Sequence, residues 1–250
     1  HRLPVCRDDE LGALAGSINT MAGEIERMLE AKRQLLLAVS HELRTPLTRA
    51  KVSAALVEND GQRQEIERDL TDVDLLLGEI LETERLQGHH VALATVSLDL
   101  TEWLREFVIS QGTVNAVTLE LPSHPVPVSA DPMRLRMLLR NVLDNARRHN
   151  TGAQKPPRLQ LVVSGDEIIL SIHDYGTGIE SRHLPHLTEP FYRADPSRQR
   201  ETGGYGMGLY LCHLIVQAHG GRLEIESGGG EGTTVKVRFP KEKTTFLNAQ

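Results

Sequence analysis

The chain has 250 residues, of which 39% are hydrophobic and 25% are charged. These proportions are typical of one or two folded globular domains with a sizeable core, and they exclude wholesale disorder. The net charge of −6 and the sequence pI of about 6.0 argue against nucleic-acid binding, and no Lys/Arg cluster indicates an anionic membrane surface.

The two cysteines, Cys6 and Cys212, lie far apart and share no metal-type spacing, so the sequence indicates neither a disulfide framework nor a zinc site. A reducing compartment fits this cysteine usage best. No apolar run approaches the roughly 18 residues that a transmembrane helix needs, and no secretory signal opens the chain. We therefore expect this stretch to be soluble as it stands.

The first thirty residues have the apolar spacing of a coiled coil. Spacings of three and four alternate along Leu11, Leu14, Ile18, Met21, Ile25 and Met28. One ordinary long helix with imperfect packing would give the same pattern. The chain starts at His1 without an initiator Met, so we expect the full protein to continue upstream.

Residues 40–48, Ser-His-Glu-Leu-Arg-Thr-Pro-Leu-Thr, combine an imidazole, a carboxylate and a hydroxyl on one predicted helix. The apolar stripe of this helix is expected to face a partner and contains Leu36, Val39 and Leu43. His41 lies roughly 200° from Val39 and so faces away from the stripe. Thr45 shares the face of His41 one turn later. Pro46 is expected to bend the helix just after His41.

A lone histidine on a helix face is most often simply solvated. Glu42, however, can hold the imidazole ring of His41 in one tautomer and accept a proton, which is what a nucleophilic imidazole needs. The local sequence therefore favours a nucleophilic histidine over a solvated one.

The helix is predicted to continue to about Glu58, where Asn59-Asp60-Gly61 signals a turn. A second amphipathic helix follows, with apolar residues three or four apart at Ile66, Leu70, Val73, Leu77 and Leu81. Gly88 stands where a helix C-cap is expected. Such a hairpin cannot bury its apolar stripe alone, so the sequence predicts a homodimer that forms a four-helix bundle.

Around Gly88-His89-His90 the pattern changes to short β-type runs mixed with helices, which predicts a domain boundary there. Strands are predicted at residues 117–121, 159–163, 168–173, 222–226 and 233–239, and helices near residues 100–110, 132–149 and 208–219. Asp131 and Pro132 supply the N-cap and the first residue of the middle helix. Helices over one face of a mixed sheet make an α+β sandwich.

Residues 141–149 place two asparagines, Asn141 and Asn145, one helical turn apart. Asn145 can offer an oxygen to a hard cation such as Mg²⁺, while the apolar residues of the same helix, Leu138, Val142 and Ala146, pack inward. A solvated asparagine is the simpler interpretation when the residue is taken alone.

Two segments carry glycines beside chemically useful groups. Residues 174–179, Asp-Tyr-Gly-Thr-Gly-Ile, end a hydrophobic strand with a carboxylate, although an ordinary strand-to-turn sequence has the same pattern. Residues 203–209, Gly-Gly-Tyr-Gly-Met-Gly-Leu, lead into a helix and predict a phosphate cradle, because free amides and the helix dipole favour an anion. A dinucleotide fingerprint is disfavoured, since no strand precedes the glycines and no βαβ unit follows.

Residues 189–195, Glu-Pro-Phe-Tyr-Arg-Ala-Asp, have no strong periodicity and could form a surface loop with an aromatic plug. The pairs His183/His186 and His89/His90 could suggest metal ligands, but no cysteine or carboxylate pattern completes a site. We expect solvated surface histidines there. The tail after Pro240 is short and polar and is expected to be poorly ordered.

Six segments, in this order along the chain, resemble the sequence boxes of sensor histidine kinases of two-component systems. They are the histidine box (residues 40–48), the N box (141–149), the G1 box (174–179), the F box (189–195), the G2 box (203–209) and the G3 box (232–234). The resemblance covers essentially the whole chain. It implies that His41 takes the γ-phosphoryl group of ATP and that Glu42 orients or deprotonates the ring. It also implies that Thr45 positions a water for phosphatase action on a response regulator, and it places Arg44 among the catalytic candidates.

The same resemblance implies a Mg-ATP site. Asn145 would ligate the Mg²⁺, Asn141 would support it, and Arg148 would pair with phosphate oxygens. Many relatives have Lys at the Arg148 position and Tyr at the His149 position, so the charge is kept and a stacking role would fall to His149. Asp174 would accept the exocyclic amine of adenine in a charge-assisted hydrogen bond.

The remaining implied contacts come from glycines and from a flexible ATP lid. Gly176 and Gly178 would let the backbone approach the nucleotide. Phe191 would anchor the lid, and Arg193 would reach the phosphates or the partner domain. The phosphate cradle would contain Gly204, Gly206, Gly208 and Leu209. Thr233, in the G3 element, would close the site near the phosphates.

Residues 8–14, Asp-Asp-Glu-Leu-Gly-Ala-Leu, and residues 18–22, Ile-Asn-Thr-Met-Ala, resemble the end of a HAMP linker. The two resemblances imply four parts: residues 1–30 as the end of a HAMP-like signalling coil, 31–90 as a dimerisation and phosphotransfer hairpin, 91–240 as an ATP-binding domain of the histidine-kinase/GHKL type, and 241–250 as a polar tail. HAMP linkers follow a transmembrane helix, so we expect an upstream sensor and anchor in a bacterial inner membrane, with this portion in the cytoplasm.

Two alternatives remain at this point. A GHKL-type ATPase of the chaperone or topoisomerase kind would share Asn145, Asp174 and the glycines but would have no use for the histidine box. A non-catalytic dimeric signalling scaffold would be expected to have lost Asn145, Asp174 or the glycines of residues 203–209, and all of them are present.

Overall fold

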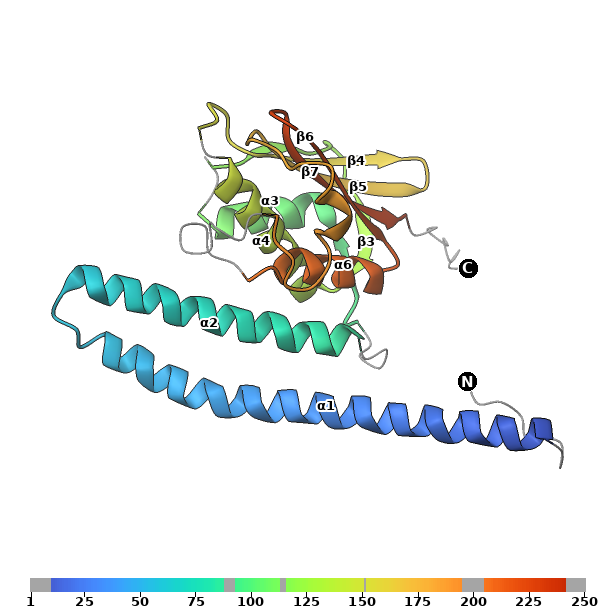
Figure 1. Ribbon diagram of the computed structural model, residues 1–250. Helices are drawn as coiled ribbons and strands as arrows, with labels where there is room; N and C mark the ends of the chain where they lie inside the picture. The colour runs from blue at the N-terminus through green and yellow to red at the C-terminus, as the bar shows by residue number, and fades with distance from the viewer. Residues whose placement is uncertain (1–9, 88–92, 113–115, 151, 195–204, 242–250) are drawn as a thin grey trace, which may run out of the picture. The chain divides into compact units, whose positions relative to one another are not determined.

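The computed structural model describes residues 10–87, 93–112, 116–150, 152–194 and 205–241 (Figure 1). The chain divides into two compact units, one ending at Glu84 and the other beginning at Arg85. The first is a helical hairpin and the second is an α/β domain. The predicted boundary at residues 88–90 and the predicted tail from 242 lie outside the described residues.

The hairpin contains α1 (Glu10–Ala54) and α2 (Asp60–Gln87). The turn lies earlier than predicted, because the Asn59 side chain caps α2 by accepting the amide of Gln62 at 3.0 Å. Asparagine serves as a turn residue and as an N-cap equally well, and here it starts a helix. Two ion pairs join the helices: Lys32 Nζ lies 2.7 Å from Glu84 Oε1, and Lys51 Nζ lies 2.8 Å from Asp74 Oδ2.

Helix α1 continues through Pro46, and Figure 1 shows it curving rather than breaking. Its buried residues Ser40, Leu47 and Ala54 recur every seven positions and so share one face. Val39 and Leu43 are 42% and 44% exposed, so the predicted stripe remains partly open to solvent. Among the described helices, none combines the length and apolarity that a membrane crossing requires.

The α/β domain has a five-stranded mixed sheet in the order β2-β4-β5-β7-β6, in which only β2 and β4 are parallel, and a two-stranded sheet of β1 and β3. Helices cover one face of the larger sheet (Figure 1), as the sequence predicted. The elements are β1 (Val96–Asp99), α3 (Leu100–Ser110), β2 (Thr118–Glu120), β3 (Pro127–Ala130), α4 (Pro132–His149), β4 (Arg158–Ser164), β5 (Glu167–Asp174), η1 (Leu184–His186), α6 (Gly208–Ala218), β6 (Arg222–Gly228) and β7 (Gly232–Pro240).

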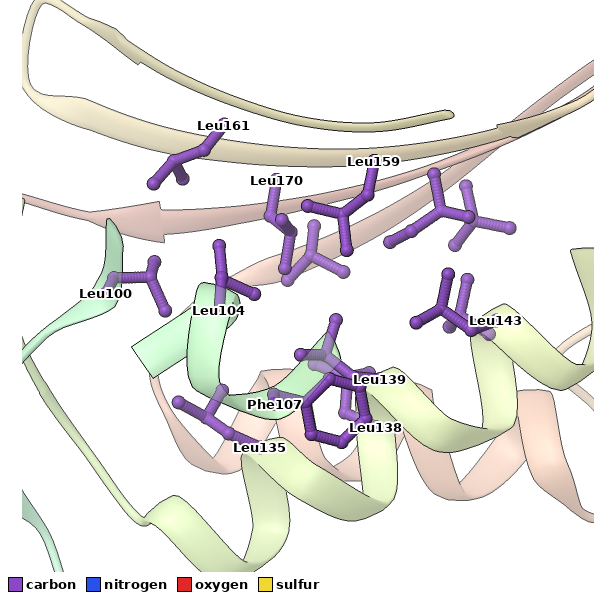
Figure 2. Close-up of a cluster of buried hydrophobic side chains, with 14 of the residues drawn as sticks. Leu100, Leu104, Phe107, Leu135, Leu138, Leu139, Leu143, Leu159, Leu161 and Leu170 are labelled. Carbon is purple, nitrogen blue, oxygen red and sulfur yellow. The ribbon is translucent and has the colours of Figure 1, made fainter. Parts of the chain in front are cut away.

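The core lies between the helices and the sheet (Figure 2). Leu104, Leu138 and Leu139 from the helices and Leu159 and Leu170 from the strands are at most 1% exposed. Each buried side chain of this size contributes roughly 1.5–3 kcal/mol. Every second residue of β5 is buried, and this alternation ends at Asp174, so the carboxylate lies on the helix-covered face.

Helix α4 begins as predicted. Asp131 Oδ1 accepts the amides of Met133 and Arg134 at 3.0 and 3.2 Å, and its Oδ2 lies 2.8 Å from Arg134 Nη1. Pro132 follows at the first position of the helix. The small β1–β3 sheet was not predicted, because each strand has only four residues and β3 begins with a proline.

Candidate functional site

The candidate acceptor surface lies on α1, where His41, Glu42, Arg44 and Thr45 are all exposed. Within the described hairpin no hydrogen bond joins His41 to Glu42, because consecutive helix residues point about 100° apart. The hydroxyl of Thr48 donates to the carbonyl of Arg44 at 2.9 Å. The imidazole is therefore open to an incoming group, and its orientation by Glu42 stays a prediction.

Helix α4 places Asn141 against the glycine-rich start of α6. Asn141 Nδ2 donates to the carbonyl of Met137 at 3.2 Å. Its Oδ1 would lie only 2.7 Å from a Cβ added at Gly208, so glycine is required for this close approach. Asn145 is half-buried, while Arg148 and His149 are exposed in the last turn of α4.

Asp174, at the end of β5, is 6% exposed and has one oxygen committed to backbone amides. Its Oδ1 accepts from Gly176 at 3.0 Å and from Thr233 at 3.2 Å. Thr233, which was expected near the phosphates, therefore lies beside the carboxylate that is predicted to bind the base. No described residue donates to Oδ2, which leaves a carboxylate oxygen available to a ligand. A Cβ at Gly176 would overlap the carbonyl of His149, and one at Gly232 would overlap the carbonyl of Asp174. These glycines therefore set how closely the loops approach the carboxylate.

Two residues that were not predicted from the sequence, Asn150 and Ser227, accept hydrogen bonds from backbone amides of the loop after Asp174. Asn150 Oδ1 accepts the amide of Tyr175 at 2.8 Å, and its Nδ2 donates to the carbonyl of Lys155 at 2.8 Å. Ser227 Oγ accepts the amide of Ile179 at 2.8 Å. The loop is thus held from α4 at one end and from β6 at the other. A polar residue directly after a helix and another near a strand end were the only available signals.

The pKa of His173, the residue before Asp174, is lowered. His173 Nδ1 lies 2.9 Å from Thr234 Oγ1, and its ring meets that of Tyr175 edge-on with centroids 4.5 Å apart. Burial, and then the nearby charge of Arg158, lower the pKa of His173, while Asp174 opposes this shift. The neutral imidazole is therefore favoured beside the carboxylate.

The predicted lid anchor differs from expectation. Phe191 is 64% exposed, so its ring does not plug the domain; its amide instead donates to the carbonyl of Gly206 at 3.0 Å. Its φ of +64°, which is rare outside glycine, turns the ring outward while the main chain binds. Tyr192 is tethered by its hydroxyl, 2.7 Å from His183 Nδ1. Arg193 is half-buried.

The start of α6 is suited to an anion. Its N-cap residue, Met207, offers no side-chain cap, so among the described residues no side chain accepts the first amides of the helix, which include those of Gly208 and Leu209. Gly206 has φ +76°, and a Cβ there would meet the backbone of Phe191. Gly204, the remaining predicted cradle residue, lies outside the described part of the chain.

Comparisons with known proteins agree with both units. A family model described as histidine kinase-, DNA gyrase B- and HSP90-like ATPase matches residues 130–243, and one described as His Kinase A (phospho-acceptor) domain matches residues 31–89. Sensor histidine kinase YkoH of Bacillus subtilis is 31% identical over 247 residues, which cover 94% of this chain and 53% of YkoH. Sensor protein RstB of Escherichia coli is 31% identical over 91% of this chain and 53% of RstB.

The chain belongs to the sensor histidine kinases. The two matched models place an ATPase-like domain after a phospho-acceptor hairpin in the chain. This kinase spans about half the length of the curated relatives it matches.

Solved structures share the fold. ShkA, crystallised at full length with AMPPNP, has a TM-score of 0.69 at 22% identity over 83% of this kinase and 45% of ShkA. AdeS of Acinetobacter baumannii has a TM-score of 0.59 at 20% identity over 81% of this kinase and 98% of the AdeS chain.

Proposed function

We propose that this kinase transfers the γ-phosphoryl group of ATP to His41 and then to an aspartate of a response regulator. One observation carries the proposal: the chain combines an exposed His41 on a helix with a buried Asp174 that keeps one oxygen for a ligand. An imidazole nitrogen bonds to the γ-phosphorus while the bond to the bridging oxygen of ADP breaks. The ring proton passes to a base, for which Glu42 is the proposed group.

The nucleotide site would use the contacts described above. Asp174 Oδ2 accepts the adenine amine, and the amides at the start of α6 receive phosphate oxygens. Gly176 and Gly178 shape the base site indirectly, because they let the loop approach the carbonyls of His149 and Gly228. Arg148 supplies positive charge, and His149 stacks on the nucleotide. Phe191 and Arg193 belong to the lid, with the anchoring contact made by the main chain of Phe191.

Mg²⁺ fits the donor set at α4. Asn145 offers one amide oxygen, and the described residues contain no group of three or more His, Cys, Asp or Glu side chains that could hold a metal. Magnesium commonly takes few protein ligands and completes its shell with nucleotide phosphates and water. Bound there with support from Asn141, it would neutralise phosphate charge.

We further propose a homodimer, anchored to a bacterial inner membrane through an upstream HAMP-linked segment, with this portion in the cytoplasm. The exposed apolar residues of α1 support the dimer, because they form an unburied seam at Leu14, Ile18, Met21, Ile25, Val39 and Leu43. Light scattering should give a dimer mass that Leu43→Asp lowers.

Thr45 is the proposed phosphatase residue, and Thr45→Ala should retain autokinase activity while losing regulator dephosphorylation.

Incubation with γ-labelled ATP tests the central proposal. Label that is acid-labile and alkali-stable should appear in the chain and disappear in His41→Gln, whereas ATP binding stays unchanged. His124→Gln is the matched control, because His124 is also exposed but lies in the α/β domain. Label retained by His41→Gln would overturn the proposal. Hydrolysis of ATP without any protein label would favour a GHKL-type ATPase, and failure to bind ATP would favour a scaffold.

A further inference from the structure

Three side chains form one row across adjacent strands at the end of the sheet. In the strand register, Asp174 of β5 faces Thr233 of β7, and Thr233 faces Ser227 of β6. Directly opposed residues point to the same face of a sheet. That face is the helix-covered one, because Asp174 continues the buried alternation of β5. A carboxylate and two hydroxyls thus stand in line beside the proposed base site.

The hydrogen bonds of Ser227 use its full capacity. A serine hydroxyl has one proton to donate and two lone pairs. Ser227 Oγ lies 2.9 Å from the carbonyl oxygen of Gly232, which can only accept, so the proton goes there. One lone pair accepts the amide of Ile179 at 2.8 Å. The last contact, with Thr233 Oγ1 at 3.0 Å, must then be donated by Thr233.

We infer that Ser227 is a positioning residue for base selection: by taking the Thr233 proton, it makes the Thr233 hydroxyl an acceptor beside the Asp174 carboxylate. The inference deepens the proposed function, because it rests on adenine binding at Asp174. With both groups able only to accept, the pocket matches the exocyclic amine of adenine. Guanine presents a carbonyl oxygen at the same ring position, which would face lone pairs without a donor.

Ser227 also fixes the geometry of the pocket. It joins the loop after Asp174, through the Ile179 amide, to the first residues of β7, through Gly232 and Thr233. A Cβ on Gly178 would lie 3.2 Å from Ser227 Oγ, so the loop and the hydroxyl are in close contact. In Ser227→Ala the Thr233 hydroxyl would lose its acceptor, and its O–H group could then rotate and donate to a guanine oxygen.

Calorimetric titration of the full chain with ADP and with GDP, each with Mg²⁺, tests the inference. The wild type should prefer ADP. Ser227→Ala should reduce the GDP-to-ADP ratio of dissociation constants by about 3- to 10-fold, the usual weight of one hydrogen bond. Ser227→Thr keeps the hydroxyl and should restore the ratio. Ser110→Ala is the matched control, because Ser110 Oγ donates to the Phe107 carbonyl at the end of α3 and should leave the ratio unchanged.

A double-mutant cycle separates base selection from a merely structural role. In a Thr233→Val background, Ser227→Ala should change the ratio by less than about twofold, because no hydroxyl remains to rotate. If Ser227→Ala fails to fold, Thr233→Val alone must weaken ADP more than GDP. An unchanged GDP-to-ADP ratio of dissociation constants in Ser227→Ala, or equal losses of ADP and GDP affinity in Thr233→Val, would overturn the inference. Neither result would contradict ADP binding by the wild type. A wild type that binds neither nucleotide would instead sink the proposed function.

Discussion

The candidate acceptor surface on α1 and the candidate base site around Asp174 differ in how their side chains are held. His41, Glu42 and Thr45 stand exposed on one helix, whereas Asp174 is buried and its loop is held by side chains from α4 and β6. Under the proposed function His41 would have to meet both ATP and a regulator, and its exposure gives both of them access. A base pocket must keep its donors and acceptors fixed before the ligand arrives, which requires support from several elements.

The contrast predicts that a small backbone change damages the pocket most. Gly178→Ala and Gly165→Ala share the cost of a positive φ, +74° and +58°, which is about 1 kcal/mol. Only Gly178 would place its Cβ against the Gly228 carbonyl, whereas Gly165 has nothing within 4 Å. Gly178→Ala should therefore weaken ATP binding on the order of 100-fold, about 2.8 kcal/mol. Titration of both variants checks this, and equal affinities would show that the loop tolerates displacement.

Asp174→Asn should have the next largest effect, and it separates support from recognition. An asparagine can still accept the amides of Gly176 and Thr233 through its oxygen, so the loops should keep their positions. Its amide nitrogen would replace the oxygen offered to adenine, and ATP affinity should fall about 10- to 100-fold, as for one hydrogen bond to a charged group. Calorimetry and thermal unfolding are the measurements.

Asp144→Asn, an exposed position on α4, is the matched control and should leave ATP binding unchanged. A fall in melting temperature that matched the loss of affinity in Asp174→Asn would contradict this division of roles, because the carboxylate would then act mainly on folding.

The same contrast explains what could be predicted from the sequence. The histidine box is local, so the spacing of Leu36, Val39 and His41 was enough to place the imidazole on the open face. The helices α3 and α4 were predicted at their observed bounds, because caps and apolar spacing are also local signals. The burial of Asp174 follows from the alternation of β5.

Contacts between distant segments could not be predicted. Asn150 and Ser227 act on backbone amides 25 and 48 residues away, and no local pattern reports such pairings. The exposure of Phe191 depends on its positive φ and its main-chain bond to Gly206. A hydrophobic side chain in a loop indicated burial, and the backbone conformation decided otherwise.

Pro46→Ala tests whether the acceptor surface depends on the shape of its helix. The substitution allows a backbone bond to the Glu42 carbonyl and removes a cost of roughly 3 kcal/mol, so the hairpin should become more stable. We expect autokinase and phosphatase rates to change severalfold in opposite directions, because a straighter α1 presents His41 differently. Pro132→Ala is the control, since a proline at the first position of α4 costs little. Unchanged rates would remove any role for the proline in switching.

The smallest expected effect concerns His219, which makes two hydrogen bonds within the fold, whereas His41 is exposed. His219 Nε2 accepts the amide of Asp131 at 3.0 Å, and Nδ1 donates to the Ile215 carbonyl at 2.7 Å. Burial lowers the pKa of His219; the Ile215 carbonyl and Asp131 oppose this shift and Arg134 adds to it. The unfolded chain therefore binds a proton more readily than the folded one just below pH 6.5, so stability falls as the pH drops through that window.

The loss cannot exceed about 1.4 kcal/mol per pH unit for one group. Denaturant unfolding between pH 7.5 and 5.5 should show a shallower pH dependence in His219→Gln than in the wild type, because glutamine does not titrate. The contribution of His173 is common to both proteins. If His219→Gln kept the wild-type slope of stability against pH, protonation of the His219 imidazole would not be linked to folding. The two hydrogen bonds of His219 would then not make the stability of the fold depend on pH.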